Sequence, residues 1–308
     1  MGNSIIQVKN LNRTYGKVQA LSHISFNVEE GEIFGIIGPD GAGKTTLFRI
    51  LTTLLLADSG SATIDNCDVV HDYRSIRKHV GYMPGKFSLY QDLSVQENLE
   101  FFATVFNTTI KENYHLVRDI YVQLEPFKKR RAGALSGGMK QKLALCCALI
   151  HKPRVLFLDE PTTGVDPVSR KEFWDMLGKL KSEGMSILVS TPYMDEAEKC
   201  DRIALIQDGS FLNIDTPRQM IEDFALPLYA VSGQSMFALL KDLREFEGIY
   251  SCFPFGDTHH VTFKDESVSL EQLRSYLEGK GHEDLSLLKI PAGIEDCFMN
   301  LADGEVSL

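Results

Sequence analysis

Short apolar runs alternate with amphipathic stripes along most of this chain. Three runs are short enough to be buried strands: residues 32–37, 155–158 and 186–189. Residues 80–84 predict a strand edge that ends at a proline. Helical spacing follows the first run at residues 44–56 and recurs at 92–131, 137–150 and 168–182. Alternation of strands with helices is typical of a parallel sheet covered by helices. Three further strands, at 5–8, 24–28 and 62–64, frame the first run and predict an antiparallel part near the N-terminus.

The pattern changes near Leu226-Pro227. From there the order is strand, helix, strand, strand, helix, strand and a last helix, at 229–231, 236–246, 250–254, 260–263, 269–279, 285–290 and 294–301. That order predicts a small α+β domain of the split βαβ kind. We therefore expect a main domain at residues 1–225 and a small one at 226–308. The second contains no recognisable catalytic constellation, so an accessory or interaction role is expected.

Composition is ordinary for a globular protein, with 44% hydrophobic and 24% charged residues. The net charge of −10 is unevenly placed, since residues 225–308 hold 14 acidic against 6 basic residues. This balance makes nucleic acid an unexpected partner. No apolar run approaches the ~20 residues of a membrane span. The six cysteines include no C-x-x-C pair and the eight histidines no metal spacing; His259 and His260 point to opposite faces of a strand.

The strongest chemical signal lies between the strand at 32–37 and the helix that begins near residue 44. It reads Gly-Pro-Asp-Gly-Ala-Gly-Lys-Thr, a G-x-x-x-x-G-K-T loop. Strand, glycine loop and helix N-terminus aim backbone N–H groups at one anion. Lys44 supplies a charge for the β- and γ-phosphates, and the Thr45 hydroxyl can ligate Mg²⁺. A chance glycine-rich turn is the alternative, which the strand and helix on either side disfavour.

An acidic pair ends the third buried strand. Asp159 and Glu160 follow four apolar residues, at the carboxyl edge where the phosphate loop also lies. Asp159 is expected to hold the metal, and Glu160 to polarise an attacking water. In isolation such a pair could simply cap a strand, but the upstream loop favours the chemical interpretation.

Further motifs carry a family resemblance. The segment Leu-Ser-Gly-Gly-Met at 135–139 resembles the signature motif of ATP-binding cassette (ABC) proteins. The run at 159–167 is similar to that family's acidic strand and D-loop, and the run at 190–198 to its switch segment. Tyr15 matches the aromatic residue that stacks on adenine. The resemblance covers roughly residues 5–224, and the last part, with 294–298, resembles the accessory domain of multidrug-type exporter subunits.

The resemblance implies a fold and a mechanism. The implied fold is α/β: a P-loop NTPase parallel sheet with an antiparallel N-terminal part, a helical subdomain at about 86–150, and the small α+β domain. ATP and Mg²⁺ are the implied cofactors, and Ser136 of one copy closes over the triphosphate that Lys44 of another holds. The residues expected at the nucleotide are Tyr15, Gly38, Pro39, Asp40, Gly41, Ala42, Gly43, Lys44, Thr45, Thr46, Ser136, Gly137 and Gly138; Thr45 and Asp159 are expected at the metal, with Glu160 as the catalytic residue.

The implied partners are a second cassette, identical or different, and a separate transmembrane permease. The implied location is the cytoplasmic face of a membrane, and the implied role is ATP hydrolysis that drives export. The alternative is a non-transport cassette, acting as a regulatory or a soluble ATP-driven factor. Translation-associated cassette proteins resemble two cassettes in tandem, whereas one phosphate loop and one signature occur here.

Two positions depart from the family pattern. Gly85 stands where the family usually has glutamine, and Pro192 where it usually has histidine. Gly85 offers no side chain to Mg²⁺ or water, and proline lacks both a side-chain donor and a backbone N–H. Gln91, six residues after Gly85, is not expected to substitute for the glutamine. Loss of one preorganised group typically costs about 10²–10³ in rate, so we expect firm ATP binding and slow hydrolysis.

Overall fold

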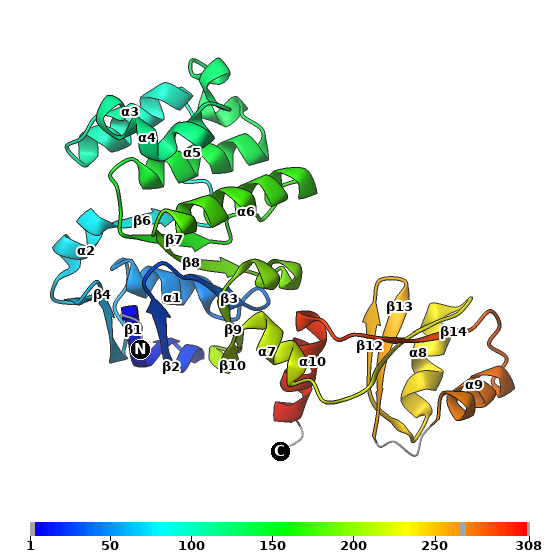
Figure 1. Cartoon of the computed structure of the whole chain (residues 1–308). Helices are drawn as coiled ribbons and strands as arrows, with labels where there is room; N and C mark the ends of the chain where they lie inside the picture. Colours follow the sequence, from blue (N-terminus) through cyan, green and yellow to red (C-terminus); the bar gives the residue numbers. More distant parts are fainter. Residues whose placement is uncertain (1–3, 265–268, 307–308) are drawn as a thin grey trace. The chain divides into compact units, whose positions relative to one another are not determined.

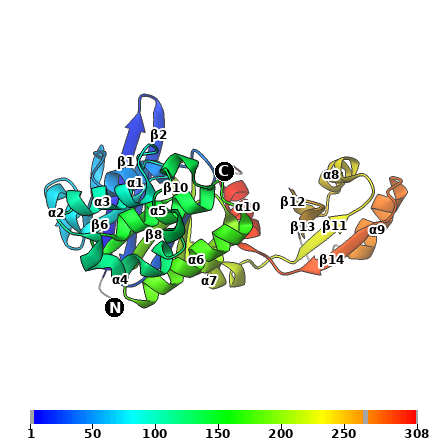
Figure 2. The same ribbon diagram turned by 90° about the horizontal axis from the view of Figure 1, so that it is seen from above.

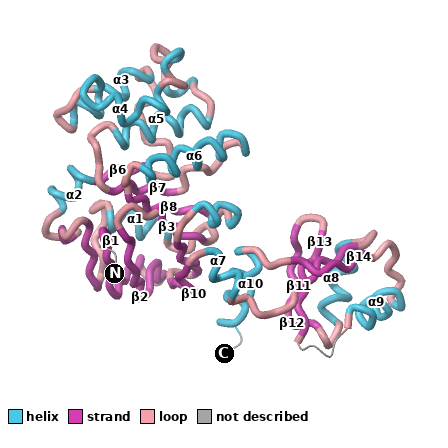
Figure 3. The backbone as a smooth tube through the Cα atoms, viewed as in Figure 1, coloured by secondary structure: helices cyan, strands magenta, loops and turns pink. Residues whose placement is uncertain are grey.

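The computed structural model describes residues 4–264 and 269–306. The chain divides into two compact units, Met1–Thr216 and Pro217–Leu308, each described here by itself. Figure 1 labels the elements in chain order, and Figure 3 separates helices from strands by colour.

A long antiparallel hairpin opens the first unit. It pairs β1 (Ser4–Tyr15) with β2 (Val18–Glu29), and the turn between them contains Gly16, whose φ is 59°. Alternate residues of both strands are buried, as the period of a strand with one covered face requires. On the other edge of β1 lie β4 (Ser59–Ile64) and β5 (Cys67–Asp68), so the expected antiparallel N-terminal part is present.

The central sheet is mostly parallel. Its strand order is β10-β9-β3-β8-β7-β6, and only β10 runs antiparallel to its neighbour. The strands β3, β7 and β8 are buried throughout, as their continuous apolar runs predict. The six strands are β3 (Ile33–Ile37), β6 (Val80–Met83), β7 (Val155–Asp159), β8 (Ser186–Thr191), β9 (Arg202–Gln207) and β10 (Ser210–Asp215).

Helices pack against this sheet, and α3, α4 and α5 gather at one end of the unit (Figure 1). Figure 2 looks down on the unit from that end. The helices are α1 (Lys44–Leu51), α2 (Tyr73–His79), α3 (Val95–Val105), α4 (Ile110–Tyr121), α5 (Gly137–Leu149) and α6 (Pro167–Ser182). Short 3₁₀ turns are η1 (Glu125–Phe127), η2 (Ala132–Ala134) and η3 (Met194–Lys199). The cysteines of α5, Cys146 and Cys147, are buried, and burial raises the pKa of both thiols.

Two expected helices differ in length. The helix expected at 44–56 ends at Leu51, and Leu54, expected on its apolar stripe, is 58% exposed. Thr53 has a φ of 63°, outside the helical region, and its carbonyl oxygen accepts a hydrogen bond from Arg77 instead of continuing the helix. The segment expected to be helical at 92–131 is broken after α3 by Asn107, whose φ is 55°. Capping boxes then begin α3 and α4 separately.

The second unit has the expected order of elements. Helix α7 (Pro217–Glu222) precedes β11 (Leu228–Ser232), α8 (Met236–Glu245), β12 (Ile249–Phe255), β13 (Thr258–Phe263), α9 (Leu270–Gly279), β14 (Ser286–Ile290) and α10 (Ile294–Val306). The antiparallel sheet has the order β12-β13-β11-β14, and leucines of α8 and α9 pack on one face of it. His259 and His260 have separate partners, the carbonyl oxygen of Met236 and the carboxylate of Asp296.

Candidate functional site

The phosphate loop joins the buried strand β3 to the first turn of α1. Gly43 takes the N-cap position of α1 with a φ of 103°, a conformation that side chains rarely adopt. A Cβ at Gly43 would lie 2.3 Å from the carbonyl oxygen of Ala20, and one at Gly38 would lie 2.1 Å from that of Ile206. Backbone therefore packs directly against backbone on both sides of the loop, and both glycines are required by geometry.

Lys44 lies inside the loop, with only 3% of the residue exposed. Its Nζ donates hydrogen bonds to the carbonyl oxygens of Gly38, at 2.8 Å, and Pro39, at 2.9 Å. The same nitrogen forms an ion pair with Glu160 Oε1 at 3.2 Å. The ammonium group is thus held by the loop's own backbone and touches the carboxylate that follows β7. This arrangement gives a fixed positive charge at the point where the helix dipole of α1 also favours an anion.

Ser190 holds both members of the acidic pair, through its hydroxyl and through its carbonyl oxygen, which also accepts from the Glu160 N–H at 3.0 Å. In the parallel register of β7 and β8, Asp159 lies beside Ser190. The Ser190 hydroxyl donates to Asp159 Oδ1 at 2.7 Å, and its oxygen accepts from the backbone N–H of Glu160 at 3.0 Å. Glu160 has a φ of 51°, so the chain turns sharply at the end of the strand. Asp159 is buried, whereas 22% of the Glu160 side chain is exposed.

Lys44 and Glu160 border one hollow of about 300 Å³. Of the residues expected at the nucleotide or in catalysis, it brings together Tyr15, Gly41, Gly43, Lys44, Thr45, Thr46 and Glu160. Gly38, Pro39, Asp40, Ala42 and Asp159 belong to the same loop and strand end but do not line it, and neither do Ser136, Gly137 and Gly138. The sequence analysis missed four lining residues: Val18, Gln19, Ala20 and Asp208.

The turn that carries Asp208 could have been found from the sequence, although its place at the hollow could not. It occupies the turn between β9 and β10 with a φ of 46° and precedes Gly209, whose φ is 81°. Asp-Gly between two apolar runs is a strong hairpin signal. The hairpin places Asp208 at the hollow because β9 is a parallel neighbour of β3, which leads into the phosphate loop.

The donor set suits Mg²⁺ better than a metal enclosed by protein ligands. The described residues contain no group of three or more His, Cys, Asp or Glu side chains that could hold a metal. Magnesium commonly takes one or two protein oxygens and completes its shell with water and substrate phosphates. Thr45, at the hollow, and Asp159, with one carboxylate oxygen fixed by Ser190, supply oxygens of that kind.

The signature segment forms a separate helix N-terminus. Ser136 is the N-cap of α5, and its Oγ accepts a hydrogen bond from the N–H of Met139 at 3.4 Å. Gly138 packs closely on α6, because a Cβ there would lie 2.7 Å from Ser169 Oγ. The segment therefore presents bare backbone beside α6 and away from the lining of the hollow.

The two departures from the family pattern lie on either side of the acidic pair. A Cβ at Gly85 would lie 3.0 Å from the carbonyl oxygen of Asp159. Gln91 lies against Gly133, whose N–H donates to the Gln91 carbonyl oxygen at 2.9 Å. Pro192 follows Thr191, the last residue of β8. The backbone of Gly85, where the family usually has glutamine, thus lies next to the acidic pair but carries no functional side chain.

Buried Glu196 holds the switch segment. Its carboxylate accepts from Thr191 Oγ1 at 2.6 Å, from Thr162 Oγ1 at 2.8 Å and from Arg170 Nε at 3.1 Å. The Arg170 guanidinium also lies 4.1 Å from the centre of the Tyr193 ring. These bonds tie the segment after β8 to the segment after β7 and to α6.

Comparison with known proteins shows the family. The family model described as "ABC transporter" matches residues 21–163. Over 305 residues the chain is 34% identical to the Nod factor export ATP-binding protein I of Burkholderia lata, covering 98% of both chains. This chain belongs to the ABC transporter ATP-binding family.

Other relatives agree with this assignment. The cassette is 42% identical over 311 residues to the probable multidrug ABC transporter ATP-binding protein YbhF of Escherichia coli K12, but it spans only 53% of that protein's length. The solved structure of cbiO1 from Clostridium perfringens superposes with a TM-score of 0.64 at 28% identity, over 72% of this chain and 92% of that one. A dimeric post-hydrolysis MJ0796 cassette bound to ADP and Pi has a TM-score of 0.63 at 26% identity, over 68% and 98%.

The fold expected from the resemblance is thereby confirmed: an α/β cassette with an antiparallel part, a mostly parallel sheet and helices. In the part of the cassette that the structure describes, no helix has the length and apolarity needed to cross a bilayer.

Proposed function

We propose that this cassette is the ATP-hydrolysing subunit of an exporter and couples ATP binding and hydrolysis to a separate membrane permease. The observation that carries the proposal is the hollow where Lys44, Thr45 and Glu160 meet beside Tyr15. Membership of the ABC transporter family supports it, as do the printed names of relatives that act in multidrug transport and Nod factor export.

The residues divide the chemistry between them. Lys44 and the loop N–H groups neutralise the β- and γ-phosphates, and Tyr15 stacks on the base. Thr45 and Asp159 hold Mg²⁺, which neutralises charge on the phosphate oxygens when it is bound. Glu160, exposed to the hollow and oriented through Ser190, polarises the attacking water.

Two copies complete each site. Because Ser136, Gly137 and Gly138 do not line the chain's own hollow, their helix N-terminus is available to the triphosphate of a neighbouring copy. A relative of the same fold is titled as a dimer in its post-hydrolysis state. ATP then joins the two cassettes and hydrolysis releases them. The test is ATP turnover by the chain reconstituted with its permease. A complex that binds ATP without turnover supports the regulatory alternative.

Gly85 and Pro192 are proposed to slow the chemical step. We expect the variant Gly85→Gln/Pro192→His to exceed the wild-type single-turnover rate by about tenfold or more, because two charge-stabilising groups are restored. The 3.0 Å approach to Asp159 means that a glutamine side chain at position 85 requires a small backbone shift, so Pro192→His is also measured alone. Rapid-quench measurement of phosphate release checks this. Equal rates in wild type and both variants would show that Glu160 suffices.

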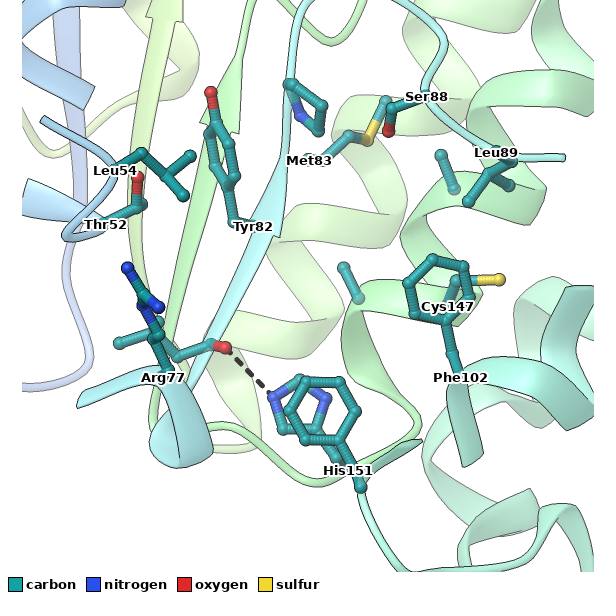
Figure 4. Close-up of a pocket in the computed structure, with 15 residues that line it drawn as sticks. Thr52, Leu54, Arg77, Tyr82, Met83, Ser88, Leu89, Phe102, Cys147 and His151 are labelled. Carbon is teal, nitrogen blue, oxygen red and sulfur yellow. Dashed lines mark hydrogen bonds between the residues drawn. The ribbon is translucent and has the colours of Figure 1, made fainter. Parts of the chain in front are cut away.

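The permease is proposed to dock in a second, apolar groove. This groove, of about 340 Å³, lies between the end of β6 and the helices α3 and α5 (Figure 4). Its lining is mostly apolar and includes Leu54, Met83, Leu89, Phe102 and Cys147, with Arg77 and His151 among its polar residues. Figure 4 shows these side chains converging from the sheet and from the helical end of the unit. An apolar groove of this kind fits one face of an amphipathic helix.

The groove also connects with the acidic pair. Met83 and Pro84 line it, and the next residue, Gly85, contacts the backbone of Asp159. Burial, aided by the charge of Asp159, raises the pKa of the groove residue Tyr82 to about 12. A permease helix seated here would therefore press on the segment that touches the metal ligand, which is a direct route for coupling.

A charge introduced into the groove should release the permease. Leu54→Glu is expected to lower co-purification with the membrane subunit by about tenfold or more, because a carboxylate would be buried in an apolar contact. Leu56→Glu is the matched control, since Leu56 is 63% exposed and does not line the groove. The measurement is pull-down from detergent-solubilised membranes. Equal recovery of the permease with both variants would contradict docking in this groove.

A further inference from the structure

Tyr15 does not stand alone on its strand. The Arg13 guanidinium lies over the Tyr15 ring, with Cζ 4.9 Å from the ring centre. The two residues are two positions apart on β1. A cation within about 6 Å of an aromatic centroid is attracted to the face of the ring. Arg13 therefore occupies one face of the ring.

Asp58 holds this pair from another part of the chain. Its Oδ1 accepts from Arg13 Nη1 at 2.6 Å, and its Oδ2 accepts from the backbone N–H of Thr14 at 2.7 Å. Its own N–H donates to the carbonyl oxygen of Asn12 at 2.9 Å. Three hydrogen bonds thus tie the residue ahead of β4 to the three residues that precede Tyr15 on β1.

Arg13 and Asp58 lie outside the lining of the hollow that Tyr15 borders. Tyr15 is 43% exposed and lines the hollow together with Lys44 and Thr45. One part of the ring is thus available to a ligand, while its support comes from groups that such a ligand does not displace.

We propose that Arg13 and Asp58 are positioning residues for the nucleobase: they fix the Tyr15 ring as a platform, with the guanidinium on one face and the base on the other. This inference rests on the proposed function, since it assigns the base to Tyr15. The platform acts only on the base. Arg13 and Asp58 therefore set how much better a nucleoside triphosphate binds than a bare triphosphate, and leave the grip on the phosphates unchanged.

The ratio of two affinities tests the proposal. Isothermal titration with Mg²⁺ compares the β,γ-imido analogue of ATP with inorganic tripolyphosphate. Tyr15→Ala is expected to lower the affinity for the analogue by roughly tenfold, because base stacking is lost. Arg13→Gln is expected to lower the affinity for the analogue by about 2- to 5-fold. Asp58→Asn is also expected to lower it. Tripolyphosphate affinity should stay within about twofold throughout, because cation–π support acts on the ring alone.

Three comparisons separate positioning from folding. Arg13→Lys keeps the cation and should restore most of the analogue's affinity. In the Tyr15→Ala background, Arg13→Gln should have no further effect, because the ring that it supports is gone. Arg74→Gln is the matched control: Arg74 lies over the Tyr73 ring, 5.7 Å from its centre, and neither residue lines the hollow.

Two results would overturn the inference. Equal weakening of the analogue and tripolyphosphate by Arg13→Gln would assign Arg13 to general electrostatics or folding. An unchanged affinity for both would show that the ring needs no support. Either result leaves the proposed function standing, provided that Lys44→Ala still weakens both ligands. A wild-type chain that binds neither ligand would reject the proposed function and this inference together.

Discussion

Glu160→Gln should lower ATP turnover by about 10²–10⁴-fold while ATP binding is retained, because it removes the group proposed to polarise the attacking water. Glutamine keeps the size of the side chain but cannot accept the proton. It also removes the negative charge that lies 3.2 Å from Lys44 Nζ, so the affinity for the triphosphate should be equal or higher. Steady-state phosphate release and nucleotide titration measure the two quantities.

The same variant tests the dimer. If hydrolysis releases the two copies, Glu160→Gln with ATP should stay dimeric in light scattering, whereas wild type returns to monomers as ATP is consumed. Glu198→Gln is the matched control, since Glu198 is an exposed residue of the switch segment. Turnover of Glu160→Gln within a few-fold of wild type would remove Glu160 from the catalytic role. If light scattering found only monomers under all conditions, the proposal that two copies complete each site would be rejected.

Lys44→Ala is expected to weaken ATP binding by about 10- to 100-fold, since a hydrogen bond to a charged group contributes about 1.5–3 kcal/mol. Lys44 is the buried cation of the phosphate loop, and its loss leaves the helix dipole and the loop N–H groups to bind alone. Nucleotide titration measures the effect, with Lys199→Ala, at an exposed position, as control.

Lys44→Ala also removes hydrogen bonds to the carbonyl oxygens of Gly38 and Pro39, so thermal unfolding is followed in parallel. Lys44→Arg provides a second variant, which keeps the positive charge but replaces the compact ammonium group by a planar guanidinium group. Unchanged affinity in a folded Lys44→Ala chain would show that the loop does not hold the triphosphate.

The sequence predicted the elements whose signals are local. The phosphate loop, the buried strand before Asp159, the Ser136 cap of α5 and the βαββαβ order of the second unit all appear where expected. Each depends on neighbouring residues alone: a glycine conformation, an apolar run, a side-chain cap or a change of hydrophobic period.

Features that depend on distant parts of the chain were not predicted. The helix at 44–56 was expected to run past Leu51, but Thr53 leaves the helical conformation and bonds with Arg77 on α2. Asp208 reaches the hollow because β9 pairs with β3, and strand order cannot be read from apolar runs. Glu196 lies in a recognised motif, yet two of its three partners, Thr162 and Arg170, come from other segments. The catalytic and binding roles of the expected residues stay predictions until the variants above are measured.

Ser190 holds the two members of the acidic pair through different atoms, and this separates what a mutation there can change. Its hydroxyl donates to the Asp159 carboxylate and accepts from the N–H of Glu160, and its carbonyl oxygen accepts from the same N–H. A substitution at position 190 removes the bond to Asp159 but keeps the carbonyl bond that holds the Glu160 backbone. Over evolution, metal affinity could therefore drift at this position with little change at Glu160, while hydrolysis could be slowed through other positions, such as Gly85 and Pro192.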